Sequence, residues 1–449
     1  MIEAAQQPIE PQGHPRGLYY LAATELAERF SYYGMTALLA LYMVHQLLLP
    51  GHAQHVWGLA ALRGLFEFRG AMSDQAFASL IYGWYGGLVY FTPILGGWLA
   101  DRRLGSKLAV TIGALLMAAG HLTMSFDETF LLALLFLILG SGLLKGNISA
   151  QVGTLYPADA ESMRARGFTI FSTGINIGSV AGPLVSGGVA AAYGWHAGFA
   201  VAAGLMLVAL AVYLLGQRHF PDTRPQSAAT ALPVLTTEER RRSWALIGVI
   251  VLIVPALISY TMIWNVGIVW IDERVSLASP FGTVPASWFN SVDSFASIVV
   301  AVPLLALWAW QARRGSEPGS LTKIAIGAAI TGASALLLAA GSLMPDAAGK
   351  VPVMYALLGF TGMGAGFMWY WPVTLALVSQ AAPARTRSTL MGGAFLSLFV
   401  GMTIMGWIGS YYEEMSNAAF WTLDAGLAVA GALLIFAARG PLHAALRAG

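Results

Sequence analysis

Two glutamates and an arginine lie within five residues of one another near the start of the chain, in the apolar stretch TELAERFSYYGM. On a helix, Glu25, Glu28 and Arg29 occupy positions i, i+3 and i+4, and Tyr32 and Tyr33 continue the same stripe. Ionisable groups are costly at membrane depth and usually mark a functional site there. We therefore expect these five side chains to face one aqueous cavity.

A second cation, Lys145, lies in another apolar stretch, GSGLLKGNISAQ. Two acids and two bases can neutralise one another if their helices meet. If a substrate carboxylate competes for Lys145 or Arg29, the released Glu25 or Glu28 binds a proton more readily. This pattern predicts proton uptake linked to substrate binding. The alternative is a static ion-pair cluster that only fixes helix packing.

Composition predicts an all-α membrane protein. Of 449 residues, 57% are hydrophobic and 10% charged, whereas a soluble protein of this size needs more charge on its surface. Runs of about 20 apolar residues, each long enough to cross a bilayer, recur along the chain. The absence of cysteine excludes disulfide and thiol chemistry. No nucleophile–base pair, metal-ligand cluster or phosphate-binding loop stands out, so we expect no enzyme, metal, cofactor or nucleic-acid partner.

The apolar runs predict twelve transmembrane helices in two six-helix bundles. Their approximate residues are 17–48, 77–100, 107–126, 129–152, 165–192, 196–216, 244–272, 287–311, 321–343, 352–381, 386–411 and 417–437. The corresponding domains are a tail (1–16), an N-terminal bundle (17–216), a linker (217–243), a C-terminal bundle (244–437) and a second tail (438–449).

Basic residues outside these spans gather on the side of both termini, and only Arg63, Arg69, Arg274 and Lys350 fall on the other side. The positive-inside rule then predicts a cytoplasmic (inner) membrane protein, in contact with lipid, with both termini in the cytoplasm.

The stretch GGWLADRRLGSKLAV joins the second and third predicted helices on that basic side. Its Asp101, Arg102, Gly105 and Lys107 follow a pattern that resembles the signature loop of the major facilitator superfamily. The resemblance implies a gating loop at the cytoplasmic surface.

A more specific resemblance runs through most of the chain. ELAERFSYYG resembles the first-helix motif Glu-x-x-Glu-Arg-Phe-x-Tyr-Tyr-Gly of the proton-dependent oligopeptide transporter (POT) family. YGGLVYFTPILGGWLADRRLG, GLLKGNIS and FTIFSTGINIGSVAGPL resemble later motifs, and they place Tyr85, Lys145 and Asn176 at that family's cavity positions.

The resemblance implies the major facilitator fold and proton-coupled symport. It assigns proton coupling to Glu25, Glu28, Arg29 and Lys145, and the substrate's carboxylate end to Arg29 and Lys145. It implies that Tyr32, Tyr33, Tyr85 and Asn176 shape the pocket.

The second half departs from the family pattern. The acid that the family carries on the tenth helix would fall at Phe367 or Met368, so it is missing. Thr36 and Thr261 stand where the family usually has an arginine and a glutamate that pair. Because both partners are absent together, no charge is stranded, and we expect neutral contacts at the outer gate.

Asp293 stands where the family has an asparagine on the eighth helix. Its carboxylate could receive a substrate ammonium in place of the missing acid. The alternative is a helix-end aspartate that faces water at the outer interface. Trp371, in the run Trp369–Trp371, could stack on a ligand or lie in the aromatic belt at the interface.

These observations predict a proton-coupled symporter that imports small peptides or peptide-like molecules. Because the amino-end site is altered, modified or cyclic peptides and non-peptide organic anions remain alternatives. A membrane receptor that binds a ligand without moving it is a further alternative, and it would have no need for the glutamate–lysine apparatus.

Overall fold

The computed structural model describes residues 13–157, 159–221, 235–280 and 282–447. Nearly all of these residues are helical. The only strands among them are β1 (Ala278–Ser279) and β2 (Gly282–Thr283), which pair antiparallel with Ala278 opposite Thr283. Most of the predicted tail 1–16, the centre of the predicted linker 217–243 and the last two residues lie outside the described ranges.

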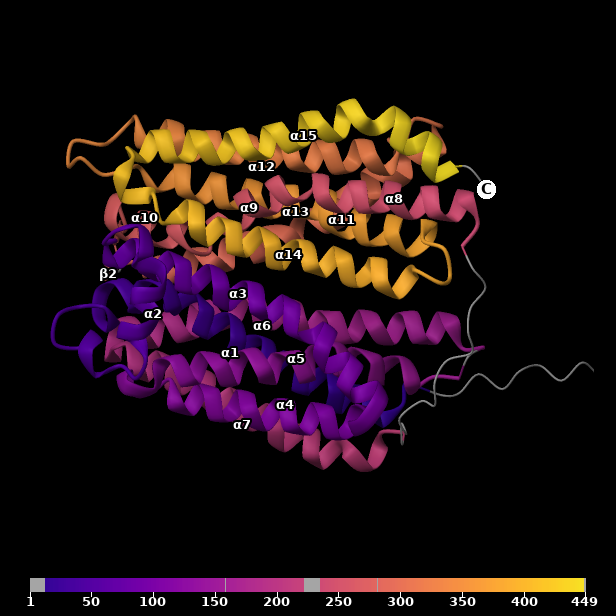
Figure 1. The fold of residues 1–449 in the computed structure, drawn as a ribbon, viewed down its shortest axis with the longest axis horizontal. Helices are drawn as coiled ribbons and strands as arrows, with labels where there is room; N and C mark the ends of the chain where they lie inside the picture. Colours follow the sequence, from indigo (N-terminus) through magenta and orange to yellow (C-terminus); the bar gives the residue numbers. More distant parts are fainter. Residues whose placement is uncertain (1–12, 158, 222–234, 281, 448–449) are drawn as a thin grey trace, which may run out of the picture.

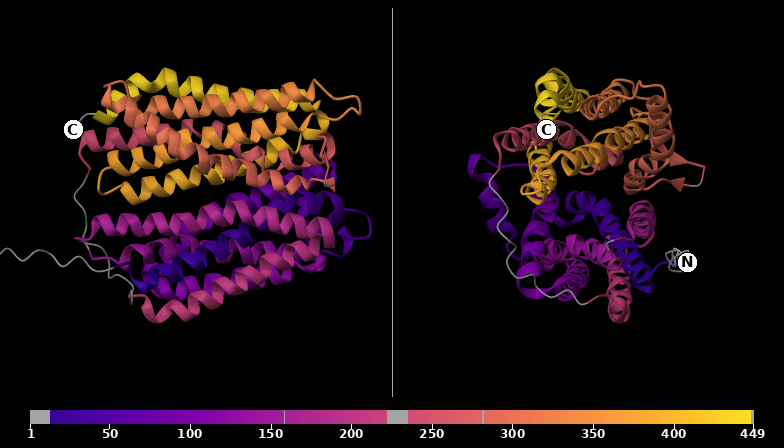
Figure 2. Two further views of the ribbon diagram at one scale, coloured as in Figure 1. Left: turned by 180° about the vertical axis from the view of Figure 1, so that it is seen from behind. Right: turned by 90° about the vertical axis from the view of Figure 1, so that its right-hand side faces the viewer.

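The helices form two groups that lie one above the other in both orientations of the molecule (Figures 1 and 2). The first half comprises α1 (Arg16–Tyr42), continued by a π-helical turn (Met43–Leu47), α2 (Leu59–Phe66), α3 (Asp74–Leu99), α4 (Ser106–Thr123), α5 (Phe130–Thr154), α6 (Glu161–Tyr193) and α7 (Trp195–Gly216). The second half comprises α8 (Thr237–Leu252), α9 (Val254–Met262), α10 (Val266–Arg274), α11 (Phe289–Arg313), α12 (Ser320–Ser342), α13 (Val353–Ala381), α14 (Arg387–Gly409) and α15 (Asn417–Arg447).

Local sequence signals set several helix starts. The Ser73 hydroxyl accepts a hydrogen bond from the Ala76 amide and caps α3. Thr236 and Glu239 form a reciprocal capping box at the start of α8. These caps satisfy amide groups that the first turn of a helix leaves without partners.

Within the described ranges, nine helical segments are long and apolar enough to cross a membrane. The long helices that do not qualify are α1, α3 and α13. α1 carries three charged residues at membrane depth, and α3 and α13 are rich in Gly, Trp and Tyr. All three of these helices contribute to the cavity described below.

Three features of the fold were not predicted from the sequence. The expected seventh span is divided into α8, α9 and α10, because Pro255 at the start of α9 has no amide hydrogen to continue the ladder and the chain turns again at Asn265. The short helix α2 lies between α1 and α3. α15 continues as a helix through residues 438–447, where we expected a tail.

The two halves meet along α3 with α14 and α6 with α11. The contacts lie toward the end of the molecule where α1 finishes and α3 begins. We call this the opposite end, because it is opposite the end that carries the basic residues named next. The other end, where α1 begins and α15 finishes, carries Arg102, Arg103 and Arg242, and we call it the basic end (Figure 1).

Small residues bring α3 and α14 together near the opposite end. A Cβ atom at Gly83 would lie 2.6 Å from the Gly406 Cα atom. The Ser79 hydroxyl donates to the Gly406 carbonyl at 3.0 Å, and the Asn265 amide donates to Ser79 Oγ at 2.7 Å. Close backbone approach through small residues is a common way for helices to pack in membranes.

The contacts at this end are partly between neutral groups and partly between ionisable ones. The hydroxyls of Thr36 and Thr261 each donate to a carbonyl of their own helix, so they form no link between the halves. However, His45 Nε2 lies 3.0 Å from Asp272 Oδ2, and this partly exposed pair joins α1's π-helical turn to α10. The sequence did not reveal this contact, because it joins residues far apart in the chain.

Enlarging Gly83 should separate the halves at the opposite end. We expect Gly83→Leu to lengthen the distance across this contact by about 2 Å, the range over which helix spacing varies with side-chain size. Pulsed electron paramagnetic resonance between spin labels at Ala61→Cys and Ala347→Cys measures it, because both positions are exposed and the chain has no native cysteine.

Gly204→Leu is the matched control, because a Cβ atom at Gly204 meets nothing within 4 Å. An unchanged distance in Gly83→Leu would contradict the glycine contact as the determinant of this packing.

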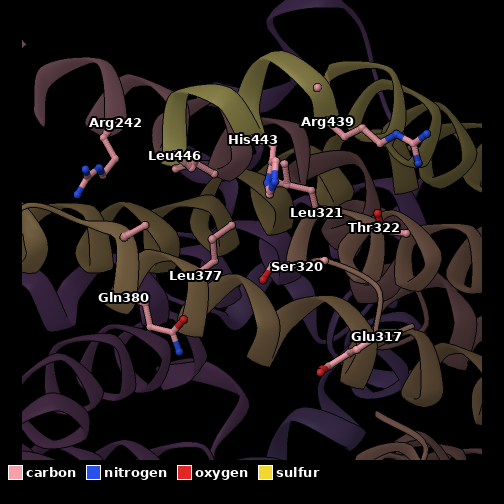
Figure 3. A pocket seen from close by; sticks show the side chains of 13 residues that line it. Arg242, Glu317, Ser320, Leu321, Thr322, Leu377, Gln380, Arg439, His443 and Leu446 are labelled. Atoms are coloured by element: carbon pink, nitrogen blue, oxygen red, sulfur yellow. The ribbon is translucent and has the colours of Figure 1, made fainter. Parts of the chain in front are cut away.

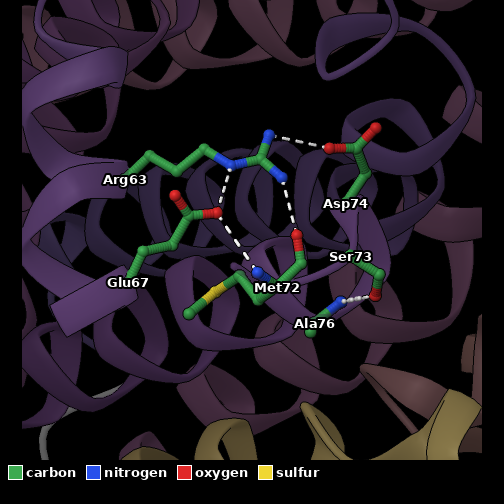
Figure 4. Close-up of polar contacts among 6 residues, drawn as sticks. All are labelled: Arg63, Glu67, Met72, Ser73, Asp74 and Ala76. Atoms are coloured by element: carbon green, nitrogen blue, oxygen red, sulfur yellow. Dashed lines mark hydrogen bonds and ion pairs between the residues drawn. The ribbon is translucent and has the colours of Figure 1, made fainter. Parts of the chain in front are cut away.

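Arg63 fastens α2 to the start of α3 at the opposite end (Figure 4). Its guanidinium donates to Glu67 Oε1 at 2.9 Å, to Asp74 Oδ1 at 2.8 Å and to the Met72 carbonyl at 2.9 Å. The Met72 amide in turn donates to Glu67 Oε1 at 3.2 Å. The hydrogen bonds from Arg63 and Met72 hold the pKa of Glu67 below its ordinary value of 4.5.

Because the folded pKa of Glu67 is lowered, its contribution to stability is present above pH 4.5 and is lost as pH falls through the lowered pKa. We expect the Met72 amide to exchange hydrogen faster, after correction for intrinsic rates, as pH falls below 4.5. Hydrogen–deuterium exchange with mass spectrometry measures this. Glu67→Gln keeps an acceptor but cannot titrate, so it should remove the pH dependence; an unaltered dependence would contradict the assignment.

Candidate substrate cavity and charge cluster

A cavity of about 300 Å³ lies between the two halves. Seven helices and the turn between α9 and α10 contribute to its wall. The lining residues are Tyr32, Tyr33, Thr36, Tyr82, Tyr90, Ile175, Asn176, Ser179, Tyr260, Thr261, Trp264, Ser294, Ser297, Phe367, Met368, Trp371, Phe395, Leu398 and Met402. None of these lining residues carries a charge.

The charged residues of α1 form a compact buried cluster. Arg29 Nε lies 3.2 Å from Glu25 Oε1 and also donates to Glu28 Oε2. Arg29 is 7% exposed and Glu28 is 0% exposed. The prediction that all five α1 side chains face one cavity is therefore wrong for Glu25, Glu28 and Arg29, because these charges pair with one another behind the wall.

Lys145 on α5 approaches this cluster through aromatic rings. Its Nζ atom lies 4.3 Å from the centre of the Tyr32 ring and 5.1 Å from that of Tyr90, and Arg29 Cζ lies 5.4 Å from the Tyr32 ring. Among the described residues no carboxylate lies within 4.0 Å of Lys145. The Tyr32 ring is thus shared by both cations and the cavity, and Lys145 keeps an ammonium available for another anion.

The other predicted residues of the first half lie on different sides of the wall. Asn176 is exposed and lines the cavity, with Ser179 one turn further along α6. Tyr85 is buried and does not line the cavity, and its hydroxyl has no partner among the described residues.

Stacked aromatic rings form the wall contributed by the second half. The Tyr260 ring stacks on Phe367 with centres 4.4 Å apart, Phe367 stacks on Trp371 at 6.2 Å, and Phe395 meets Trp371 edge-on at 5.8 Å. Phe367 holds a position where the sequence indicated a missing acid. Trp371 is 9% exposed and faces the cavity, so the structure favours the ligand-facing alternative over the interface belt.

Sequence analysis identified Trp371 but missed Tyr260 and Phe395. Tyr260 directly precedes Thr261 and belongs to a helix whose break at Pro255 we did not predict. Phe395 carries no motif that distinguishes it from other apolar residues of α14.

Asp293 lies behind this wall, near the start of α11. It is 0% exposed, and its Oδ2 atom accepts a hydrogen bond from the Tyr260 hydroxyl at 2.9 Å. The alternative of a helix-end aspartate facing water is therefore wrong. Its neighbour Ser294 lines the cavity, but Asp293 does not; the Tyr260 ring, whose hydroxyl contacts the carboxylate, lies between Asp293 and the cavity.

The chain matches the sequence model of a known protein family. The sequence model of the POT family matches residues 107–236 and 228–423, which together span most of the chain. The protein belongs to the POT family. It is therefore a member of a family of membrane transporters.

Characterised relatives and solved structures agree with this assignment. The chain is 28% identical to a di-/tripeptide transporter of Lactococcus lactis subsp. cremoris over 497 residues, with 96% of each chain covered. It is 28% identical to the peptide transporter YePEPT of Yersinia enterocolitica subsp. palearctica over 506 residues, with 94% of each covered. A crystal structure of a mutant peptide transporter POT in complex with alafosfalin has a TM-score of 0.85 at 26% identity, covering 98% of this chain and 97% of that one.

The predicted gating loop of this POT-family protein lies at the basic end, away from the cavity. Asp101 and Arg102 belong to a π-helical turn (Ala100–Leu104), and the Arg102 guanidinium lies 5.2 Å from the centre of the Trp98 ring. Gly105 has a φ of 73°, which side-chain-bearing residues rarely adopt, and it allows α4 to begin at once. Lys107 lies in the first turn of α4.

A larger hollow, about 930 Å³, lies at the basic end of the second half (Figure 3). Arg242, Arg439 and His443 line it, but Figure 3 shows the guanidinium groups of the two arginines extending in opposite directions. They do not converge on a single anion, so we do not assign a substrate site there.

Removing the central cation of the α1 cluster should destabilise the POT-family fold strongly. Arg29→Met strands Glu25 and Glu28 without a cation in contact, and we expect a loss of about 3–5 kcal/mol in the free energy of unfolding. Lys145→Met strands no contacting carboxylate and should cost only about 1–2 kcal/mol, the size of a buried cation–π contact. Denaturation in detergent micelles measures both variants, and equal losses would contradict the pairing.

Proposed function

We propose that this protein is a proton-coupled symporter that imports small peptides or peptide-like molecules by alternating access. The observation that carries the proposal is the paired cluster Glu25–Arg29–Glu28, with Lys145 nearby and uncommitted to a carboxylate, beside a cavity between the two halves. The di-/tripeptide transport named for the L. lactis relative supports the substrate class.

We infer a topology of twelve transmembrane helices in two six-helix bundles of the major facilitator type. The first bundle (17–216) would contain α1 and α3–α7. The second (244–437) would contain the broken helix α8–α10 as one span, followed by α11–α15. The basic end would face the cytoplasm, with both termini and the linker 217–243 on that side of the inner membrane.

On this topology the halves touch at the outer end. The α3–α14 glycine contact and the His45–Asp272 pair would then close the outer gate, and a substrate would reach the cavity from the cytoplasmic side. Rocking of the bundles around the cavity would open the outer end, with the Asp101–Lys107 turn as part of the inner gating apparatus.

The charged cluster would couple protons to substrate. Lys145, whose ammonium rests on aromatic rings, and Arg29 would receive the substrate's carboxylate. When Arg29 turns toward the substrate, Glu25 or Glu28 loses its partner and takes a proton, which keeps net charge out of the membrane. Tyr32, Tyr33 and Asn176 would shape this end of the pocket, and Tyr85 would support it from behind the wall.

The other end of the substrate would meet Tyr260, Phe367 and Trp371. No carboxylate lines the cavity, so an ammonium gains no direct ionic partner there, whereas an apolar or aromatic group gains stacking. Asp293 would act on this end only through Tyr260. Peptides with apolar side chains or blocked amino ends therefore suit this cavity better than ordinary peptides with a free amino end.

Uptake into liposomes tests the proposal. We expect an inward proton gradient to drive accumulation of labelled di-alanine, and we expect Lys145→Ala to abolish that accumulation because the variant lacks the cation that would receive the substrate's carboxylate. Acetylated di-alanine should compete about as well as the free peptide, because the aromatic wall offers no carboxylate to an ammonium.

Liposomes without a gradient and liposomes without protein are the controls. Accumulation that Lys145→Ala leaves intact would contradict the coupling mechanism. A free peptide that competed far more strongly than its acetylated form would contradict the aromatic site. The absence of both uptake and competition for every peptide tested would contradict peptide import.

A further inference from the structure

Asp293 is a buried acid that accepts a hydrogen bond from the Tyr260 hydroxyl, and the Trp264 indole also lies beside its carboxylate. Its Oδ2 atom accepts from the Tyr260 hydroxyl at 2.9 Å, and its Oδ1 atom has no partner among the described residues. Packing around it is tight, since a Cβ atom at Gly364 on α13 would lie 2.2 Å from the Asp293 carbonyl oxygen. That contact is to the main chain of Asp293, and the residue as a whole is 0% exposed.

No cation contacts this acid. Among the described residues, no Lys, Arg or His nitrogen lies within 4.0 Å of the Asp293 carboxylate. The neighbouring helices α9 and α13 contain no charged residue or histidine at all. The charged residues of α6, α10 and the rest of α11 lie at the ends of those helices: Glu161, Arg164, Arg166, Asp272, Glu273, Arg274 and Arg313.

The titratable side chains that face Asp293 are tyrosines. Tyr260 contacts it directly, and Tyr33 on α1 and Tyr82 on α3 lie within range of its charge. A carboxylate ion without a cation is costly in such surroundings, and the protonated acid is the form that this site accommodates. The ammonium-binding role suggested by the sequence would require a path to the cavity that the Tyr260 ring blocks.

Tyr260 connects this acid to the cavity. Its ring lines the cavity and stacks on Phe367, which stacks on Trp371. A substrate that enters must contact these rings, and displacement of Tyr260 would remove the hydrogen bond to Asp293 and admit water to the carboxyl group. A ligand in the cavity would therefore affect the protonation of Asp293 through the Tyr260 hydroxyl.

We propose that Asp293 is the proton-carrying group of the second half and that Tyr260 couples its proton to occupancy of the cavity. This inference rests on the proposed function and adds a second proton site to the cluster on α1. It also accounts for the neutral Thr36 and Thr261, because a proton on Asp293 needs no intramembrane ion pair beside it.

A second buried acid provides a matched control. Asp424 on α15 is 1% exposed, accepts from Ser259 at 2.7 Å and, like Asp293, has one oxygen without a partner among the described residues. Neither Asp424 nor Ser259 lines the cavity. Asp424→Asn therefore makes the same chemical change in the same half without touching the coupling path.

Infrared spectroscopy of the purified full-length protein tests the proton directly. We expect a carbonyl-stretching band of a protonated carboxylic acid at neutral pH that disappears in Asp293→Asn. In Tyr260→Phe, which keeps the ring stack, that band should move to higher frequency because its hydrogen bond is lost. Asp424→Asn should leave this band in place, and adding di-alanine or its acetylated form should shift it in the wild type.

Exchange of labelled di-alanine across liposomes at equal pH on both sides tests the coupling. We expect the pH dependence of the exchange rate to be lost in Asp293→Asn, displaced in Tyr260→Phe and unchanged in Asp424→Asn. Size-exclusion chromatography of each variant identifies folding failure, and Tyr260→Phe keeps the test decisive if Asp293→Asn does not fold.

The outcomes separate this inference from the proposed function. Absence of the Asp293 band, or a band that does not respond to a peptide that the wild type transports, would overturn the inference while leaving peptide import intact. A wild-type protein that shows the band but neither binds nor transports peptides would refute the proposed function and the coupling with it. Equal effects of Asp424→Asn and Asp293→Asn would also overturn the specific role of Asp293.

Discussion

Arg29 pairs with two glutamates of its own helix, and the rest of the cavity region is arranged around that pairing. The guanidinium lies between Glu25 and Glu28, so three ionisable groups are buried in the membrane with a single net negative charge. Lys145 approaches from α5 over the face of Tyr32 and balances that charge without contacting a carboxylate. The ion pairs in this arrangement can exchange partners, because Arg29 contacts both glutamates and Lys145 contacts neither.

The second half treats charge differently. Among its described residues no cation lines the cavity, and the buried acids Asp293 and Asp424 each accept a hydrogen bond from one hydroxyl. Aromatic rings occupy the wall where an acid was missing from the sequence, and Phe367 is held between Tyr260 and Trp371. The cavity therefore has one side that is backed by Arg29 and Lys145 and another that is formed by stacked aromatic rings, which is a physical basis for orienting an amphipathic ligand with a carboxylate at one end.

The two halves are joined through close contacts of small residues, beside which Phe399 of α14 meets the Trp84 and Phe91 rings of α3. Glycines at positions 83 and 406 let α3 and α14 approach, and short polar side chains bridge them. Such an interface gains energy from van der Waals contact and hydrogen bonds rather than from excluding water, since lipid is as apolar as a leucine side chain.

The sequence by itself determined the membrane class, most helix positions and the charged residues of α1 and α5, because hydrocarbon imposes a minimum helix length and makes every buried charge conspicuous. It also indicated that Phe367 replaces an acid and that Thr36 and Thr261 replace an ion pair. Only the tertiary structure decided which side of the wall each group occupies. Glu28 and Asp293 are hidden while Asn176 faces the cavity, and the contacts Tyr260–Asp293 and His45–Asp272 join residues from separate helices. Helical periodicity gives the direction of a side chain on its own helix, but the neighbour it meets depends on how the helices pack.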